Sequence, residues 1–189
     1  NADRDAVRLG GRIKANLLSG LTETATYSGA IGGSVSGFTS TQRGQPAVFS
    51  GIAVLPSSFS NSAEVLFEHG GTGSGTHVGM VDVSGTKKLI VRSGHGTAGS
   101  TASDANQVVK LINISDIAEF DDQSHRVTLE VHPTATGGGS VRFWIDNRLV
   151  VDETTTGSNF NSNLWSGGDA GGWGQRGDSL AGYDSTTTP

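Results

Sequence analysis

The chain has 189 residues, of which 29 are Gly, 23 Ser and 19 Thr. Gly costs about 1 kcal/mol per helix position, and Ser and Thr compete for backbone hydrogen bonds, so this composition excludes a mainly helical protein. Cys is absent, which excludes disulfides, a Cys-based zinc site and a thiol nucleophile. The net charge of −5, with 13 basic residues scattered among 18 acidic ones, argues against nucleic acid as a partner.

Residues 3–21 carry the chain's one helical periodicity, in apolar residues spaced three to four apart between arginines and a lysine. Gly10 and Gly11 weaken this pattern. Two interpretations stand: an amphipathic arm that docks on a neighbouring subunit, or an edge strand or loose terminus. Residues 1–46 are therefore assigned to an N-terminal arm, with a helix as one alternative, and a Gly/Ser/Thr-rich connection.

From Ala47 onward short apolar segments alternate with turn signals. Strands are predicted at residues 47–55, 63–68, 77–83, 87–92, 107–114, 126–132, 140–145 and 148–152. Turns are predicted between them at residues 56–58, 70–73, 84–85, 94–96, 137–139 and 146–147. This spacing of strands and turns is typical of an antiparallel sandwich or barrel. The apolar stretches are interrupted by polar residues and are shorter than the ~20 residues that a membrane helix needs.

Alternation is clearest in the two late strands. Val127, Leu129 and Val131 share one face of the first, and Val141, Phe143 and Ile145 share one face of the second. Each strand is therefore expected to bury one face, which is the pattern of a two-sheet sandwich. Residues 47–189 are assigned to this single domain, because 34% hydrophobic residues suffice for one core.

Acidic residues raise the question of a glycoside hydrolase, which needs two facing carboxyl groups. The run Glu119-Phe120-Asp121-Asp122 begins like the Glu-x-Asp-x-x-Glu pattern of concanavalin-like glucanases but lacks the final Glu. Its position before a strand favours a solvated acidic turn. No catalytic residue is predicted.

Two further groups invite a binding interpretation. Glu64 and Glu68 flank Leu66 at even spacing in a predicted strand and are assigned to its solvent-facing side. This favours a polar outer face over a sugar contact. His69, His77 and His95 lie near the ends of consecutive strands and would form a metal or pH-sensitive cluster if they converged. Ordinary loop histidines are the favoured interpretation, so no metal and no cofactor is expected.

Trp165 and Trp173 flank a Gly-rich segment that also holds Asp169. Aromatic rings in such loops stack on sugar rings while nearby carboxylates accept hydrogen bonds from hydroxyls. Rings that plug the edge of a sandwich are the competing interpretation. A carbohydrate site is accordingly predicted at Trp165, Asp169, Trp173, His69 and Glu68.

Several segments in this order resemble laminin-G-like, concanavalin A-like domains. They are residues 49–54 (FSGIAV), 64–71 (EVLFEHGG), 77–82 (HVGMVD), 125–131 (HRVTLEV), the hairpin 141–151 and the Gly-rich 167–172. The resemblance implies an antiparallel jelly-roll sandwich used mainly for glycan or protein binding, in versions found in bacteriophage structural proteins. Calcium is often held by such domains, but no dense carboxylate loop is present here.

The family normally adds a strand after the Gly-rich segment, whereas this chain ends in Ser185-Thr186-Thr187-Thr188-Pro189. We therefore expect a longer natural product or a strand supplied by a neighbouring subunit. The resemblance predicts a non-catalytic virion module, in capsid decoration or a tail, that assembles with itself or other subunits and contacts cell-surface glycans. The alternatives are a secreted carbohydrate-binding module and a glucanase-like enzyme.

Overall fold

A computed structural model describes residues 46–60, 63–71, 74–95, 103, 106–134, 137–157, 160 and 172–173. The predicted N-terminal arm lies outside these residues, as do Trp165 and Asp169. In the part of the chain that is described, no helix is long and apolar enough to cross a membrane.

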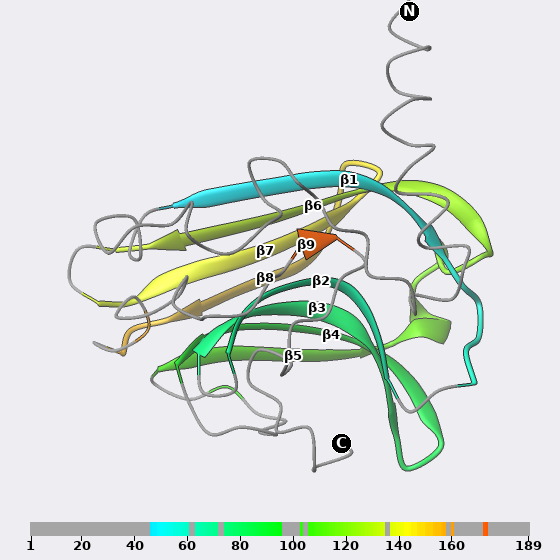
Figure 1. Cartoon of the computed structure of the whole chain (residues 1–189), viewed down its shortest axis with the longest axis horizontal. Helices are drawn as coiled ribbons and strands as arrows, with labels where there is room; N and C mark the ends of the chain where they lie inside the picture. The colour runs from blue at the N-terminus through cyan, green and yellow to red at the C-terminus, as the bar shows by residue number, and fades with distance from the viewer. Residues whose placement is uncertain are drawn as a thin grey trace, which may run out of the picture.

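The described fold is all-β and consists of two antiparallel sheets (Figure 1). One sheet has the order β1-β6-β7-β8 and the other β5-β4-β3-β2-β9. A 3-10 turn, η2 (Ile114–Asp116), follows β5. The strands are β1 (Ala47–Leu55), β2 (Ala63–Gly71), β3 (Ser74–Val83), β4 (Thr86–His95), β5 (Gln107–Asn113), β6 (Gln123–Pro133), β7 (Gly139–Ile145), β8 (Arg148–Thr155) and β9 (Gly172–Trp173).

All eight strands predicted from the sequence are present, several of them longer than expected. β3 and β4 extend to a Gly-rich end where Gly75 pairs with Gly94, because backbone pairing continues where apolar side chains stop. The predicted turn at Asp146-Asn147 has positive φ at both residues, 47° and 70°. This is the type I′ geometry that suits the twist of a two-residue hairpin.

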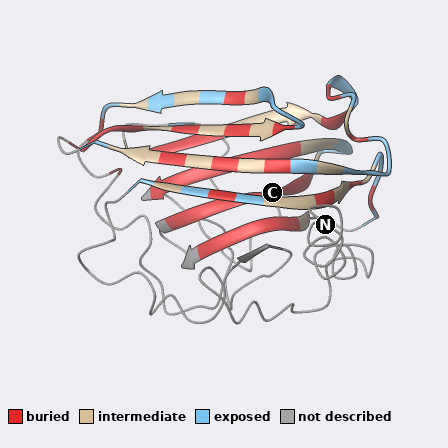
Figure 2. Ribbon diagram, turned by 90° about the horizontal axis from the view of Figure 1, so that it is seen from above, coloured by how far each residue is buried: buried red, intermediate tan, exposed pale blue. Residues whose placement is uncertain are grey.

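The main core lies between the sheets and takes apolar side chains from both. β6 and β7 contribute every second residue to this core. Along β7, buried and half-buried residues therefore alternate strictly over residues 139–145. The one-sided burial expected of these two strands is confirmed, and Figure 2 shows it as alternating colours along the four-stranded sheet.

The five-stranded sheet differs, because both of its faces are buried. Leu89 and Val91 of β4 join the main core, whereas Ile90 between them packs with Val65, Val81 and Val109 on the opposite face. Figure 2 shows long red stretches in this sheet, although β5 is half-buried from Lys110 to Asn113. The expectation of one-sided strands is therefore wrong for this sheet. Continuous apolar runs such as Leu89-Ile90-Val91 are the pattern of a strand covered on both faces.

Two contacts join the sheets at their margins. Phe160 is fully buried in the main core, and its ring lies so close to Gly94 of β4 and Gly139 of β7 that a Cβ at either would crowd it. At the lateral edge, Lys110 of β5 donates to Glu153 of β8 at 2.7 Å. Aromatic packing and an ion pair thus link β4 with β7 and β5 with β8.

Candidate functional site

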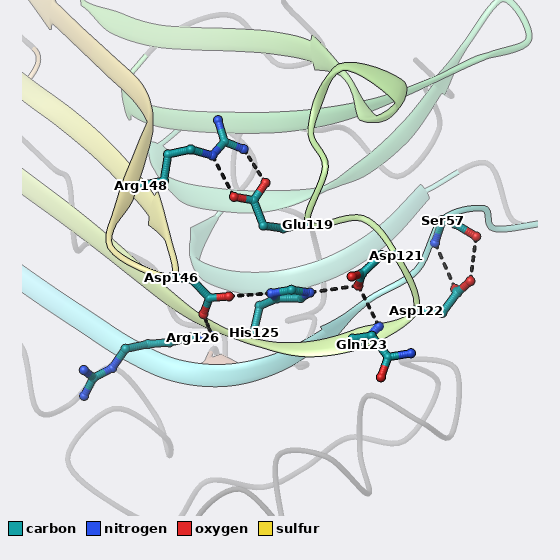
Figure 3. A network of polar contacts seen from close by, with 9 residues as sticks. All are labelled: Ser57, Glu119, Asp121, Asp122, Gln123, His125, Arg126, Asp146 and Arg148. Atoms are coloured by element: carbon teal, nitrogen blue, oxygen red, sulfur yellow. Dashed lines mark hydrogen bonds and ion pairs between the residues drawn. The ribbon is translucent and has the colours of Figure 1, made fainter.

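A polar network gathers at the end of the fold where the 117–122 connection, the start of β6 and the β7–β8 turn meet (Figure 3). His125 lies at its centre with carboxylates on both sides. Its Nδ1 is 2.6 Å from Asp146 Oδ2, and its Nε2 is 2.8 Å from Asp121 Oδ1. An imidazole can donate from both nitrogens only when protonated, so this geometry selects the imidazolium.

Asp146 is held by the backbone as well as by His125. Its Oδ1 accepts from the Arg126 N–H at 2.8 Å, and its own N–H donates to the Arg126 carbonyl at 2.8 Å. The β7–β8 turn is thereby fixed to the first residues of β6. The carboxylate serves the turn and the imidazole at the same time.

Two more carboxylates of the acidic connection have partners of their own. Glu119 accepts from Arg148 through both oxygens, which ties the connection to the start of β8. Asp122, in the left-handed region at φ 67°, accepts from the Ser57 backbone at 2.9 Å and from its hydroxyl at 2.7 Å. Asp121 and Asp122 form the predicted turn before β6, but the turn is cross-linked through its carboxylates rather than simply solvated.

The charges of this network stabilise one another. Burial opposes protonation of His125, but hydrogen bonds to Asp121 and Asp146 outweigh it and raise the pKa of the imidazole. The same bonds lower the pKa of both carboxyls. Arg148 lowers the pKa of Glu119, and the Ser57 hydroxyl lowers that of Asp122. The four carboxyls are therefore held as anions.

A second group of charged side chains is buried on the face of the five-stranded sheet that points away from the main core. Glu68 pairs with His77 across β2 and β3, and His77 with Arg92 across β3 and β4, so the three form one cross-strand row. The Arg92 guanidinium donates to Gln107 at 2.6 Å. Glu68, His77 and Gln107 are 0% exposed and Arg92 1%.

The burial of Glu68 corrects the sequence-based parity argument. Glu64 is half-buried, but Glu68 is on a covered face and not on a solvated one. The outer face of the sheet is polar at this row and apolar beside it, since Val65 and Ile90 belong to the same side. A sugar could contact Glu68 only if this face became accessible.

The predicted histidine cluster does not form between His69 and His77. His69 pairs with Thr76, the residue before His77, and neighbouring residues of a strand point to opposite faces. Burial lowers the pKa of His69 to about 4, so it is neutral at pH 7. In the described part of the chain, no group of three or more His, Asp or Glu side chains is arranged to hold a metal ion.

Backbone pairing places β9 beside β2 but does not join the side chains of the predicted carbohydrate site. In β9, Trp173 pairs with Phe67 and Gly172 with Glu68, so the Gly-rich segment ends beside β2 (Figure 1). Glu68 and His69 are consecutive residues of β2, so their side chains point to opposite faces of the sheet. Trp165 and Asp169 lie outside the described residues, and the site as a whole stays a prediction.

An open groove of about 540 Å³ lies at one end of the four-stranded sheet. Its walls include His132 and Arg142 with Ser140 and the Thr154–Thr156 run. These side chains could donate to and accept from hydroxyl groups, which makes the groove a second candidate surface for a polar ligand.

Sequence reasoning missed His125 and Arg92. His125 appeared only as the first residue of the segment 125–131 that carries the family resemblance. Its partners Asp121 and Asp146 are 4 and 21 residues away, so no local spacing joins them. For Arg92 a signal existed: a charged residue directly after the apolar run Leu89-Ile90-Val91 continues a strand buried on both faces.

Comparison with known proteins adds no identity to this geometry. No protein-family model matches the chain, and no curated protein is significantly similar to it.

Proposed function

We propose that this chain is a non-catalytic structural and recognition module with a concanavalin A-like jelly-roll fold. In this proposal it belongs to a phage virion, in capsid decoration or a tail, assembles with itself or other subunits, and contacts glycans. The two antiparallel sheets around a shared core are compatible with that architecture. The residue segments that resemble the family supply the rest of the argument.

One observation carries the preference for a structural role. Each carboxylate of the acidic connection, Glu119, Asp121 and Asp122, fixes that connection to another part of the fold. Partners lower the pKa of all three. A glycosidase acid needs a raised pKa, because it must deliver a proton near neutral pH. These groups are built as cross-links.

Recognition of glycans is assigned to the segment around Trp165, Asp169 and Trp173. The pairing of Gly172 with Glu68 and of Trp173 with Phe67 places the backbone at the end of this segment beside β2. Stacking on a ring and hydrogen bonding to hydroxyls is the usual chemistry of saccharide binding.

A glucanase-like activity is the competing function, and a specific observation favours it. Glu68 is buried in one row with His77 and Arg92 on a sheet face. Buried ionisable groups with charged neighbours occur often in active sites, although structural networks share this property.

The deciding experiment incubates the protein with β-glucans and other polysaccharides, measuring binding and the release of reducing ends. We expect binding without release, and loss of binding in Trp165→Ala or Trp173→Ala at unchanged thermal stability. Release that Glu68→Gln abolishes would establish the enzyme instead. Mass spectrometry of purified phage particles tests the virion assignment. If the protein is found only outside the particles, a secreted binding module is favoured instead.

A further inference from the structure

Strand β1 is an edge strand with few of the features that protect edges. Among the described strands it pairs with β6 alone, over nine consecutive residue pairs from Ala47↔Val131 to Leu55↔Gln123 and with no bulge. Its sequence, AVFSGIAVL, holds no charge and no Pro. A long, regular and uncharged edge is one that another strand can join.

The other edges are different. β5 and β8 are linked to each other by Lys110–Glu153, and β8 carries further charge in Asp152 and Arg148. β9 has two residues. In the described part of the chain two large apolar side chains are exposed, and Val48 of β1, at 57%, is the more exposed. Among the described strands, β1 is therefore the one long edge that holds neither a charge nor a Pro.

The sequence of β1 is compatible with pairing to itself. An antiparallel register that pairs all nine residues is centred on Gly51, and it sets Val48 opposite Val54 and Ser50 opposite Ile52 on the outward face. On the core face it sets Phe49 opposite Ala53, a large side chain against a small one. No like charges meet, so pairing has no electrostatic cost.

We propose that β1 joins β1 of a second copy, antiparallel about Gly51, and that the two four-stranded sheets become one continuous eight-stranded sheet. The occupant of the edge is thus another copy of this chain. The inference deepens the proposed structural role and rests on it for its biological meaning. Its test needs neither a glycan nor a virion.

The charge experiment uses two double variants of the full chain. Val48→Lys/Val54→Lys places like charges opposite each other at both ends of the paired strands, whereas Val48→Lys/Val54→Glu places opposite charges there. Both variants change the same two positions. By sedimentation equilibrium we expect a mass of twice 19.4 kDa for the parent and for the Lys/Glu variant. The dissociation constant of the Lys/Lys dimer should be at least about tenfold higher than that of the parent dimer.

A cross-linking experiment tests the register directly, because the chain has no Cys of its own. In Val48→Cys/Val54→Cys the two positions of one chain lie about 20 Å apart along the strand, so a disulfide can form only between copies. We expect a covalent dimer on mild oxidation. Val48→Cys alone should give none, since position 48 faces position 54 and not itself.

A parent that is monomeric at about 100 μM, or equal dissociation of the two charge variants, would overturn the inference. Slow hydrogen exchange of the β1 amides in a monomer would do so as well, since it would show that the chain covers its own edge. Polysaccharide binding that persists in a monomer would leave the proposed function standing, so the two failures are distinguishable.

Discussion

His125 and Asp146 connect the start of β6 to the turn between β7 and β8, with 2.6 Å between Nδ1 and Oδ2. The contact joins residues 21 positions apart and depends on the imidazolium form, because Asp121 occupies the other nitrogen. The end of the fold is therefore held by an imidazole whose pKa these two carboxylates raise above its ordinary value.

Stability should fall as the pH rises above neutrality through this group. The folded-state pKa of His125 is raised above 6.5, so its contribution is complete below about 6.5 and is lost as the pH rises through the folded value. Urea unfolding between about pH 5 and 9 should show this slope, and His125→Gln should flatten it. Identical pH profiles of parent and variant would contradict the assignment.

The same pair predicts the opposite slope in acid. The pKa values of Asp121 and Asp146 are lowered below 3.8, so their contribution is present above that value and is lost as the pH falls through the folded pKa values. Asp146→Asn should weaken this acid dependence and cost about 1 kcal/mol at neutral pH, because the Asp146 side chain is 49% exposed and solvent screens its charged hydrogen bonds. Asp152→Asn, on an exposed ion pair, is the matched control and should cost under about 1 kcal/mol.

Arg92 should be far more important for stability than Arg142. Arg92 is 1% exposed and donates to Gln107, whereas the Arg142–Asp152 pair is 41% and 47% exposed. Arg92→Ala leaves buried polar partners without their cation and should cost about 3–5 kcal/mol. Arg142→Ala should cost about 0–1 kcal/mol in the same denaturation assay, and equal costs would show that the buried row is not an energetic unit.

Gly79→Ala should destabilise the protein because no space exists for a methyl group. A Cβ there would overlap the backbone carbonyl of Glu64 and approach His77 Nε2 to 2.6 Å. We expect a cost of about 1–3 kcal/mol by thermal or urea unfolding. Adding His77→Ala should not rescue the variant, since the Glu64 carbonyl cannot move aside; full rescue would place the conflict in the imidazole alone.

Phe160→Ala should cost about 3–5 kcal/mol, because its fully buried ring fills the space between Gly94 and Gly139. Phe160→Leu is the control and should recover part of the loss by refilling the space. Unfolding free energies that leave Phe160→Ala within 1 kcal/mol of the parent would contradict this packing role.

The sequence by itself determined the strands and many of the turns. The alternation of apolar residues predicted the buried faces of β6 and β7, and Asp146-Asn147 predicted a two-residue hairpin turn. Both predictions succeed because each pattern depends on residues that are neighbours in the sequence. The solvent-side placement of Glu68 was wrong because parity within one strand does not reveal whether the opposite face is covered.

Tertiary structure alone decided which groups meet. The Glu68–His77–Arg92 row depends on strand register, and the Asp121–His125–Asp146 contact depends on where a loop and a turn converge. Such contacts join residues that only pairing between strands and packing of the connections bring together. Local propensity sets the conformation of each segment, whereas the partners of a side chain follow from non-local pairing and packing.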